Sequence, residues 1–201
     1  MIEYREEASE TETPSSNSAV ATLEPGNLYT GTLREEYQSG EMMLTIPRLD
    51  VWNVPVESGT DDDALAQGPG LFLYAQMPSQ QNGNVSIAGH RDIHGSLFYY
   101  LHNLSQGDYF YLDWQGKVYR YLYEKTYVVE PDDWSPIKTQ GYSCLTLLSC
   151  HPIGTSEKRI IVVAKLEDTA EQSEAYEYKP WCDGLSKPYA WEDNAKSFDK
   201  S

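Results

Sequence analysis

The segment from residue 144 to residue 166 most narrows the folds that this chain can adopt. It contains two runs rich in aliphatic and β-branched residues, Cys144–Cys150 and Arg159–Leu166, joined by a short connection, and this pattern predicts two β-strands paired as a hairpin. Cys150 ends the first predicted strand and Arg159 opens the second. A hairpin therefore places a thiol and a guanidinium group opposite one another.

A third predicted strand supplies a histidine. Residues 84–90 read Asn-Val-Ser-Ile-Ala-Gly-His, so His90 lies at the end of a strand. A thiol, an imidazole and a guanidinium can act as nucleophile, acid/base and oxyanion stabiliser. A cysteine that ends an apolar strand is by itself more often structural. The prediction of a catalytic site therefore depends on the combination of His90, Cys150 and Arg159.

The rest of the folded part predicts an all-β structure with few and short helices. Further strands are predicted at residues 42–46, 51–56, 71–75, 108–114 and 117–129, and short helices at residues 61–66 and 95–104. Short strands at regular spacing indicate a β-sandwich or a β-barrel.

Acidic extensions flank this domain. Residues 1–27 are rich in Glu, Ser, Thr and Pro, which predicts a disordered segment. Residues 168–201 are acidic but contain several Tyr and Trp residues, so we expect a strap packed on the barrel exterior, the alternative being a segment over the active groove or against a partner. The formal net charge of −16 argues against nucleic acid or an anionic membrane surface as a partner.

Three separated motifs resemble those of a known family. Thr146–Cys150 reads Thr-Leu-Leu-Ser-Cys and resembles the Thr-Leu-x-Thr-Cys signature of sortases, with Ser149 in place of the usual threonine. Ala88–Arg91 resembles the segment that holds the sortase histidine, and Arg159 lies where the last sortase strand supplies an arginine. The likeness covers residues 44–166 with the motifs in matching order, and Cys-His-Pro after the strand most resembles the housekeeping-type classes D and E.

The resemblance implies a fold and an activity. It implies a closed eight-stranded β-barrel over residues 28–167 and a cysteine transpeptidase with His90, Cys150 and Arg159 as its catalytic residues. Such an enzyme cleaves a C-terminal Leu-Pro-x-Thr-Gly type sorting motif after threonine through a thioacyl intermediate on cysteine. The implied partners are surface proteins with sorting signals and an amine from a peptidoglycan precursor or a pilin lysine.

The resemblance also implies a location. Sortases are usually anchored by one membrane helix and act at the extracellular face of the membrane. No run in the sequence approaches the ~18 apolar residues of a membrane-spanning helix. We therefore expect a soluble ectodomain from which the anchor is absent, and we expect neither a cofactor nor a metal.

Three further residues are candidates for contact with a substrate. Ser149 precedes the cysteine, and His151 follows it as a loop residue that lies near the substrate or is simply solvated. Ile161 belongs to one face of the last strand, and alternation predicts that this face is an apolar floor for an extended peptide. The same alternation assigns Ile160, Val162, Ala164 and Leu166 to the barrel core.

Metal sites and a disulfide are weaker interpretations of other residues. Asp61–Asp63 could bind calcium, but acidic residues favoured at a helix N-terminus explain them more simply. His90 and His94 have a spacing that binds zinc on a helix, but no third ligand is evident. Cys144 and Cys182 could form a disulfide, although a small buried side chain is the favoured role of Cys144.

Three alternatives concern the mechanism and its control. Arg91 competes with Arg159 for the oxyanion role, and Arg159 is preferred because its strand adjoins that of the cysteine in sequence. The barrel could be a non-catalytic binding or adhesin module, or an enzyme kept latent by residues 168–201. Separately from these alternatives, the Asp-Pro-aromatic lid that pilin-polymerising sortases carry before the barrel is not evident in the sequence, although Pro131–Trp134 could be mistaken for it.

Overall fold

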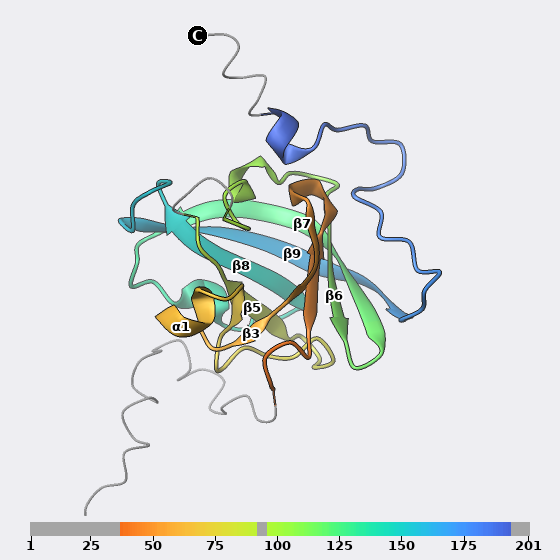
Figure 1. Ribbon diagram of the computed structural model, residues 1–201, viewed down its shortest axis with the longest axis horizontal. Helices are drawn as coiled ribbons and strands as arrows, with labels where there is room; N and C mark the ends of the chain where they lie inside the picture. The colour runs from red at the N-terminus through yellow and green to blue at the C-terminus, as the bar shows by residue number, and fades with distance from the viewer. Residues whose placement is uncertain (1–36, 92–95, 194–201) are drawn as a thin grey trace, which may run out of the picture.

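The computed structural model describes residues 37–91 and 96–193, and its strands form one curved sheet (Figure 1). The strands are β1 (Met43–Ile46), β2 (Val51–Pro55), β3 (Glu57–Ser58), β4 (Gly70–Leu71), β5 (Asn84–Ala88), β6 (Tyr109–Trp114), β7 (Lys117–Val129), β8 (Cys144–His151) and β9 (Lys158–Glu171). Their order is β2-β1-β6-β7-β9-β8-β5-β4-β3. The predicted all-β barrel is confirmed, while the predicted disordered segment 1–27 lies outside the described residues.

The sheet has nine strands where eight were expected. The additional strand arises because the segment predicted as one strand at residues 51–56 bends at Val56 and continues. Before the bend β2 pairs with β1, and after it β3 pairs with β4. Because β2 and β3 stand at opposite ends of the strand order, this one segment nearly closes the sheet into a barrel. The Val56 N–H donates to the carbonyl of Met42 at 2.9 Å and holds the bend in place.

The helices are shorter than predicted. Helix α1 spans Asp62–Leu65 and is capped by Asp61, whose carboxylate accepts from the Ala64 N–H at 3.0 Å. Short 3-10 turns are η4 (Pro47–Leu49), η5 (Leu101–Asn103) and η6 (Ser135–Ile137). The predicted helix at residues 95–104 is therefore wrong, because its described part forms successive turns that end in η5. No described helix is long and apolar enough to cross a bilayer.

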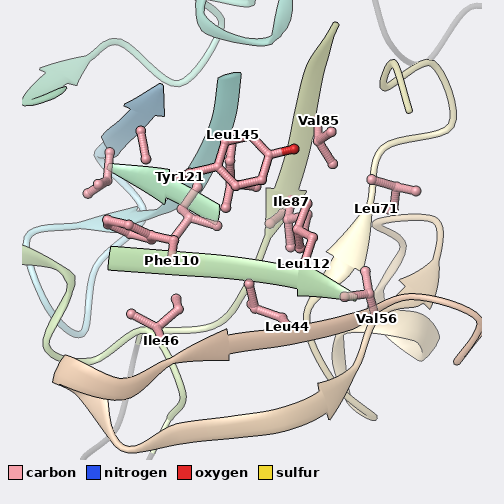
Figure 2. Packing of buried hydrophobic residues seen from close by; sticks show 14 of the residues in the cluster. Leu44, Ile46, Val56, Leu71, Val85, Ile87, Phe110, Leu112, Tyr121 and Leu145 are labelled. Atoms are coloured by element: carbon pink, nitrogen blue, oxygen red, sulfur yellow. The ribbon is translucent and has the colours of Figure 1, made fainter. Parts of the chain in front are cut away.

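The barrel interior is filled by side chains from alternate positions of the strands. Figure 2 shows side chains of β1, β5, β6, β7 and β8 pointing into one cluster. Ile160, Val162 and Ala164 of β9 join this cluster, as the alternation predicted. The opposite face of β9 contributes Ile161 and Val163 to a separate buried cluster with Cys144. Both faces of β9 are thus buried over these residues.

The C-terminal extension packs on the outside of the barrel. In Figure 1 it runs, in blue, from the end of β9 along the β6 side. The rings of Tyr176 and Tyr178 make edge contacts with Tyr111 of β6 at centroid distances of 6.1 and 5.1 Å. The Tyr178 hydroxyl donates to Asp113 at 2.9 Å, and the Tyr109 N–H donates to the carbonyl of Pro180 at 3.0 Å. The described part of the extension therefore forms the strap expected from its aromatic content.

A buried carboxylate ties this strap to the barrel. Asp108 is fully buried, and burial raises its pKa. Lys187 of the strap contacts Asp108 Oδ1 through Nζ at 3.0 Å, and Arg48 lies 3.6 Å from Oδ2. Arg48 also contacts Asp193 of the strap at 3.0 Å. The strap thus supplies charges that the buried groups of the barrel need.

We expect Lys187→Met to lower the free energy of unfolding by roughly 1–3 kcal/mol, because Asp108 then loses a charged hydrogen-bond partner in a buried site. The measurement is urea unfolding followed by tryptophan fluorescence. The matched control is Lys179→Met, another strap lysine whose ion pair with Asp183 is exposed and which we expect to leave the unfolding midpoint unchanged. Equal effects of the two substitutions would show that the Asp108 cluster does not hold the strap.

Candidate active site

Three neighbouring strands bring the predicted catalytic residues together. β5 pairs in parallel with β8, with Ala88 opposite Leu148, and β8 pairs antiparallel with β9, with Cys150 opposite Arg159. Continuing the register of β5 and β8 by two residues sets His90 beside Cys150. Directly opposed residues of neighbouring strands share one face of a sheet. The order across the sheet is therefore histidine, cysteine, arginine.

Gly89 and Ser149 fasten the histidine end of β5 to the cysteine strand. The Gly89 N–H donates to the carbonyl of Leu148 at 3.1 Å, and the Ser149 hydroxyl donates to the carbonyl of Gly89 at 2.5 Å. A Cβ atom at Gly89 would approach the buried ring of Phe98 to 2.6 Å. Only glycine fits here without a shift of that ring, so the backbone beside His90 is closely packed on both sides.

A groove of about 320 Å³ opens over this row of residues. Its lining comprises Thr60, Asp62, Leu65, Phe72, Ala88, Gly89, His90, Pro131, Asp133, Trp134, Leu148, Ser149, Cys150 and Arg159. The three predicted catalytic residues share this one groove. Cys150 and Arg159 are half-buried and His90 is exposed. A substrate in the groove would therefore reach the thiol, the imidazole and the guanidinium together.

The guanidinium of Arg159 is only partly engaged by the protein. Its Nη1 donates to the carbonyls of Ser156 and Lys158 at 2.9 and 3.0 Å. These contacts steady the side chain at the start of β9 opposite Cys150. The planar guanidinium has five N–H donors, so other donors remain for an oxygen that develops negative charge in the groove.

Arg91 has a different environment from Arg159. Its side chain is 2% exposed, and it donates from Nε to the carbonyl of Tyr99 at 3.2 Å and from Nη1 to that of Cys150 at 3.2 Å. Nη2 lies 2.9 Å from Nδ1 of His102. Burial lowers the pKa of Arg91, and its interactions with Tyr99 and Cys150 partly offset this. With its donors engaged, Arg91 is poorly placed for the oxyanion role.

The predicted substrate-binding residues lie in three different places. Ser149 lines the groove, although its hydroxyl is used on Gly89. His151 lies beside Arg91, with Nδ1 3.4 Å from Arg91 Nη1. Ile161 is fully buried in the cluster with Cys144. This corrects the expectation that Ile161 belongs to an open floor, since aromatic and aliphatic side chains of β7 and β8 cover that face of β9.

The groove also has an aromatic wall, which was not predicted from the sequence. Phe72 and Trp134 both line the groove, and their rings meet edge to face at a centroid distance of 6.3 Å. Pro131 extends the same wall. Pro131 and Trp134 belong to the connection that leads into β8. Their closeness in sequence to the strand of Cys150 was the one feature of the sequence that could have indicated a place in the groove. The segment is therefore part of the groove wall.

The residues considered for metals and for a disulfide have other roles here. Asp61 caps α1 as described above, and His94 lies outside the described residues. Within residues 37–91 and 96–193, no cluster of three or more His, Cys, Asp or Glu side chains could hold a metal ion. Cys144, Cys150 and Cys182 are free thiols. Cys144 and Cys182 pack in separate clusters, so they do not form a disulfide.

Comparison with known proteins finds similarity to sortases. The sortase domain family profile matches residues 44–167. The curated Sortase SrtE1 of Streptomyces coelicolor is 31% identical over 149 residues, covering 67% of this chain and 42% of that protein. Sortase A of Streptococcus agalactiae is 35% identical over 140 residues, covering 67% and 56%. This chain thus spans about half the length of these relatives.

A solved structure gives the same result for the fold. The crystal structure of sortase E1 from Streptomyces coelicolor, with a tripeptide in its active site, superposes with a TM-score of 0.63 at 29% identity. The match covers 70% of this chain and 98% of that one. The family profile covers more than half of the chain and includes His90, Cys150 and Arg159. This chain therefore belongs to the sortase family.

Proposed function

We propose that this protein is a cysteine transpeptidase that acts on proteins with a C-terminal sorting motif of the Leu-Pro-x-Thr-Gly type. The observation that carries the proposal is the shared groove of His90, Cys150 and Arg159, one from each of three adjacent strand ends. A thiol, an imidazole and a guanidinium in one groove meet the needs of acyl transfer. Membership of the sortase family supports the same reaction.

The first half of the reaction forms an acyl-enzyme. The Cys150 thiolate attacks the carbonyl carbon of threonine, and Arg159 donates hydrogen bonds to the oxygen that becomes negatively charged. The C–N bond to glycine then breaks, and protonated His90 gives its proton to the leaving amine. A thioester remains on Cys150, and the glycine end of the substrate departs.

The second half of the reaction transfers the acyl group. Neutral His90 removes a proton from an incoming primary amine as the amine attacks the thioester carbonyl. The C–S bond breaks, the thiolate is restored, and an amide forms between threonine and the acceptor. The acceptor is an amine of a peptidoglycan precursor or a pilin lysine, and the reaction takes place at the extracellular face of the membrane.

The groove lining supports a short apolar peptide as the substrate. Leu65, Phe72 and Trp134 present apolar surface near the thiol, which suits a leucine-proline pair. The tripeptide bound in the active site of the related sortase E1 supports a peptide ligand of this size. That relative also favours assignment to class E among the sortase classes.

Two other functions have less support. A non-catalytic binding module would not need the histidine, cysteine and arginine to meet in one groove, yet all three line it. Latency through the C-terminal extension requires that this segment cover the groove. Its described residues pack instead against β6, β7 and the loop after η5, and none of them lines the groove.

The proposal is tested by mass spectrometry of the protein with Leu-Pro-x-Thr-Gly and Leu-Ala-x-Thr-Gly peptides, with and without an added amine. We expect a hydroxylamine-labile adduct on Cys150 and a ligated product that depends on the amine, and the preferred peptide identifies the motif. A thiol that alkylates readily but forms no adduct with either peptide would contradict the proposed motif. An inert thiol without an adduct would favour the binding module.

A further inference from the structure

A buried cation contacts the backbone of the cysteine proposed as the nucleophile and has no part in the reaction proposed above. Arg91 follows His90 in sequence, yet it is 2% exposed and is not among the residues that line the groove. It reaches the carbonyl of Cys150 from Nη1 at 3.2 Å. This carbonyl belongs to the same residue as the nucleophilic thiol. The hydrogen bond from Arg91 therefore restrains the backbone from which the thiol projects.

The other donors of Arg91 connect this backbone to the turn at η5. Nε donates to the carbonyl of Tyr99, and Nη2 lies 2.9 Å from Nδ1 of His102. Burial, followed by the charge of Arg91, lowers the pKa of His102. A neutral imidazole can accept from Nη2 through Nδ1, whereas an imidazolium could not. In the tautomer that carries its proton on Nε2, neutral His102 accepts this hydrogen bond through Nδ1 and holds the guanidinium in one orientation.

The η5 turn is in turn held by the C-terminal strap. The Asn103 side chain donates from Nδ2 to the carbonyl of Ala190 at 3.0 Å, and Ala190 is fully buried. Arg48, paired with Asp193 of the strap, also donates to the carbonyl of Asn103 at 3.4 Å. Contacts thus run without a gap from the strap to η5, from η5 to Arg91, and from Arg91 to the carbonyl of Cys150.

On the premise that the groove catalyses transpeptidation, we propose that Arg91 is a positioning residue for the Cys150 thiol and that the C-terminal strap, through η5, sets the position of Arg91. Arg91 does not touch the substrate, so it acts through the backbone of Cys150. The strap then supports catalysis, and its loosening lowers the rate. Latency through the same extension predicts a change of the opposite sign.

The first test compares two substitutions of His102. His102→Leu removes the acceptor for Arg91, whereas His102→Asn keeps an oxygen near the place of Nδ1. Because small displacements of a catalytic group cost as much as ~100-fold in rate, we expect His102→Leu to lower kcat by about 5- to 20-fold with KM within about threefold. His102→Asn should restore kcat to within about twofold of the wild type. Equal kcat values for the two variants would overturn the proposal.

The second test addresses the arginine with a readout that needs no substrate. In a Cys182→Ala background, we expect Arg91→Met to lower the rate of iodoacetamide alkylation of Cys150 at pH 7 by about fivefold or more, because Arg91 holds the backbone from which the thiol projects. An alkylation rate equal to that of the parent would overturn the positioning role. A changed rate in a protein that turns over no peptide would overturn transpeptidation alone. If Arg91→Met fails to fold, the His102 pair decides.

The third test addresses the strap. Asn103→Ala removes the side-chain hydrogen bond to the carbonyl of Ala190. We expect kcat to fall in this variant, as in His102→Leu. The matched control is Gln106→Ala, since Gln106 lies in the same loop but donates to the carbonyl of Glu124 on β7. Gln106→Ala should leave kcat unchanged. Equal kcat values for these two variants would overturn the link between the strap and the thiol.

Discussion

Replacing Cys150 with alanine is expected to abolish peptide turnover and the covalent adduct while the barrel stays folded. The loss in kcat should be on the order of 10⁴-fold or more, because the thioester intermediate cannot form without the Cys150 sulfur. Cys150 is half-buried at the end of β8, so alanine leaves the strand pairing intact. We expect the free energy of unfolding to change by less than about 1 kcal/mol. Peptide cleavage followed by chromatography, together with a urea titration, measures both quantities.

The control for this prediction is Cys182→Ala. Cys182 is also a half-buried free thiol, but it packs beside the strap tyrosines. We expect its replacement to leave turnover and the adduct unchanged. Turnover that survives in Cys150→Ala and disappears in Cys182→Ala would place the nucleophile on the strap and contradict the assignment of the groove.

The placement of His90, Cys150 and Arg159 in one row was predictable because it depends on regular structure. Strong alternating or apolar patterns mark β8, β9 and the strand that leads to His90. Such patterns predict strands, and the short connection between β8 and β9 predicts their pairing as a hairpin. Alternation also identified the core face of β9 correctly. Alternation could not predict that the other face of β9 is buried as well, because the side chains that bury Ile161 come from distant positions on β7 and β8.

The groove wall was not predictable for a related reason. Phe72 follows β4 and Trp134 precedes β8, so their rings meet across more than sixty residues of sequence. Phe72 belongs to the segment predicted as a strand at residues 71–75, of which only Leu71 lies in β4, and Trp134 belongs to a connection without a regular period. The helix predicted at residues 95–104 failed in the same way: buried Phe98, Leu101 and Leu104 have near-helical spacing, but successive turns serve to bury them.

The choice between Arg91 and Arg159 shows where sequence position alone falls short. Both arginines adjoin a predicted catalytic residue, and either could stabilise an oxyanion. Their hydrogen bonds distinguish the two arginines. Arg91 contacts Tyr99, Cys150 and His102. Arg159 donates from Nη1 alone to two carbonyls and lines the groove. The two guanidinium groups therefore have different roles, and we expect their substitutions to affect turnover and thiol alkylation differently.

We expect Arg159→Met to lower kcat by about 10²–10³-fold with KM little changed, since the lost hydrogen bonds form chiefly in the transition state. Arg159→Lys should show an intermediate loss, because an ammonium keeps the charge but not the planar fork of donors. Steady-state kinetics with the preferred peptide measures both parameters. Arg120→Met is the control, because Arg120 pairs with Glu167 outside the groove, and it should keep the wild-type kcat.

The comparison with Arg91 makes the prediction sharper. The rate of Cys150 alkylation, measured in Arg159→Met and in Arg91→Met, distinguishes an oxyanion donor from a residue that holds the thiol. The reason is that alkylation by iodoacetamide develops no oxyanion on a peptide carbonyl. Arg159→Met should lose far more in turnover than in alkylation, while Arg91→Met should lose in both. If Arg159→Met retained kcat within about fivefold of the wild type, well short of the loss expected for an oxyanion donor, backbone N–H groups of the groove would have to stabilise the oxyanion instead.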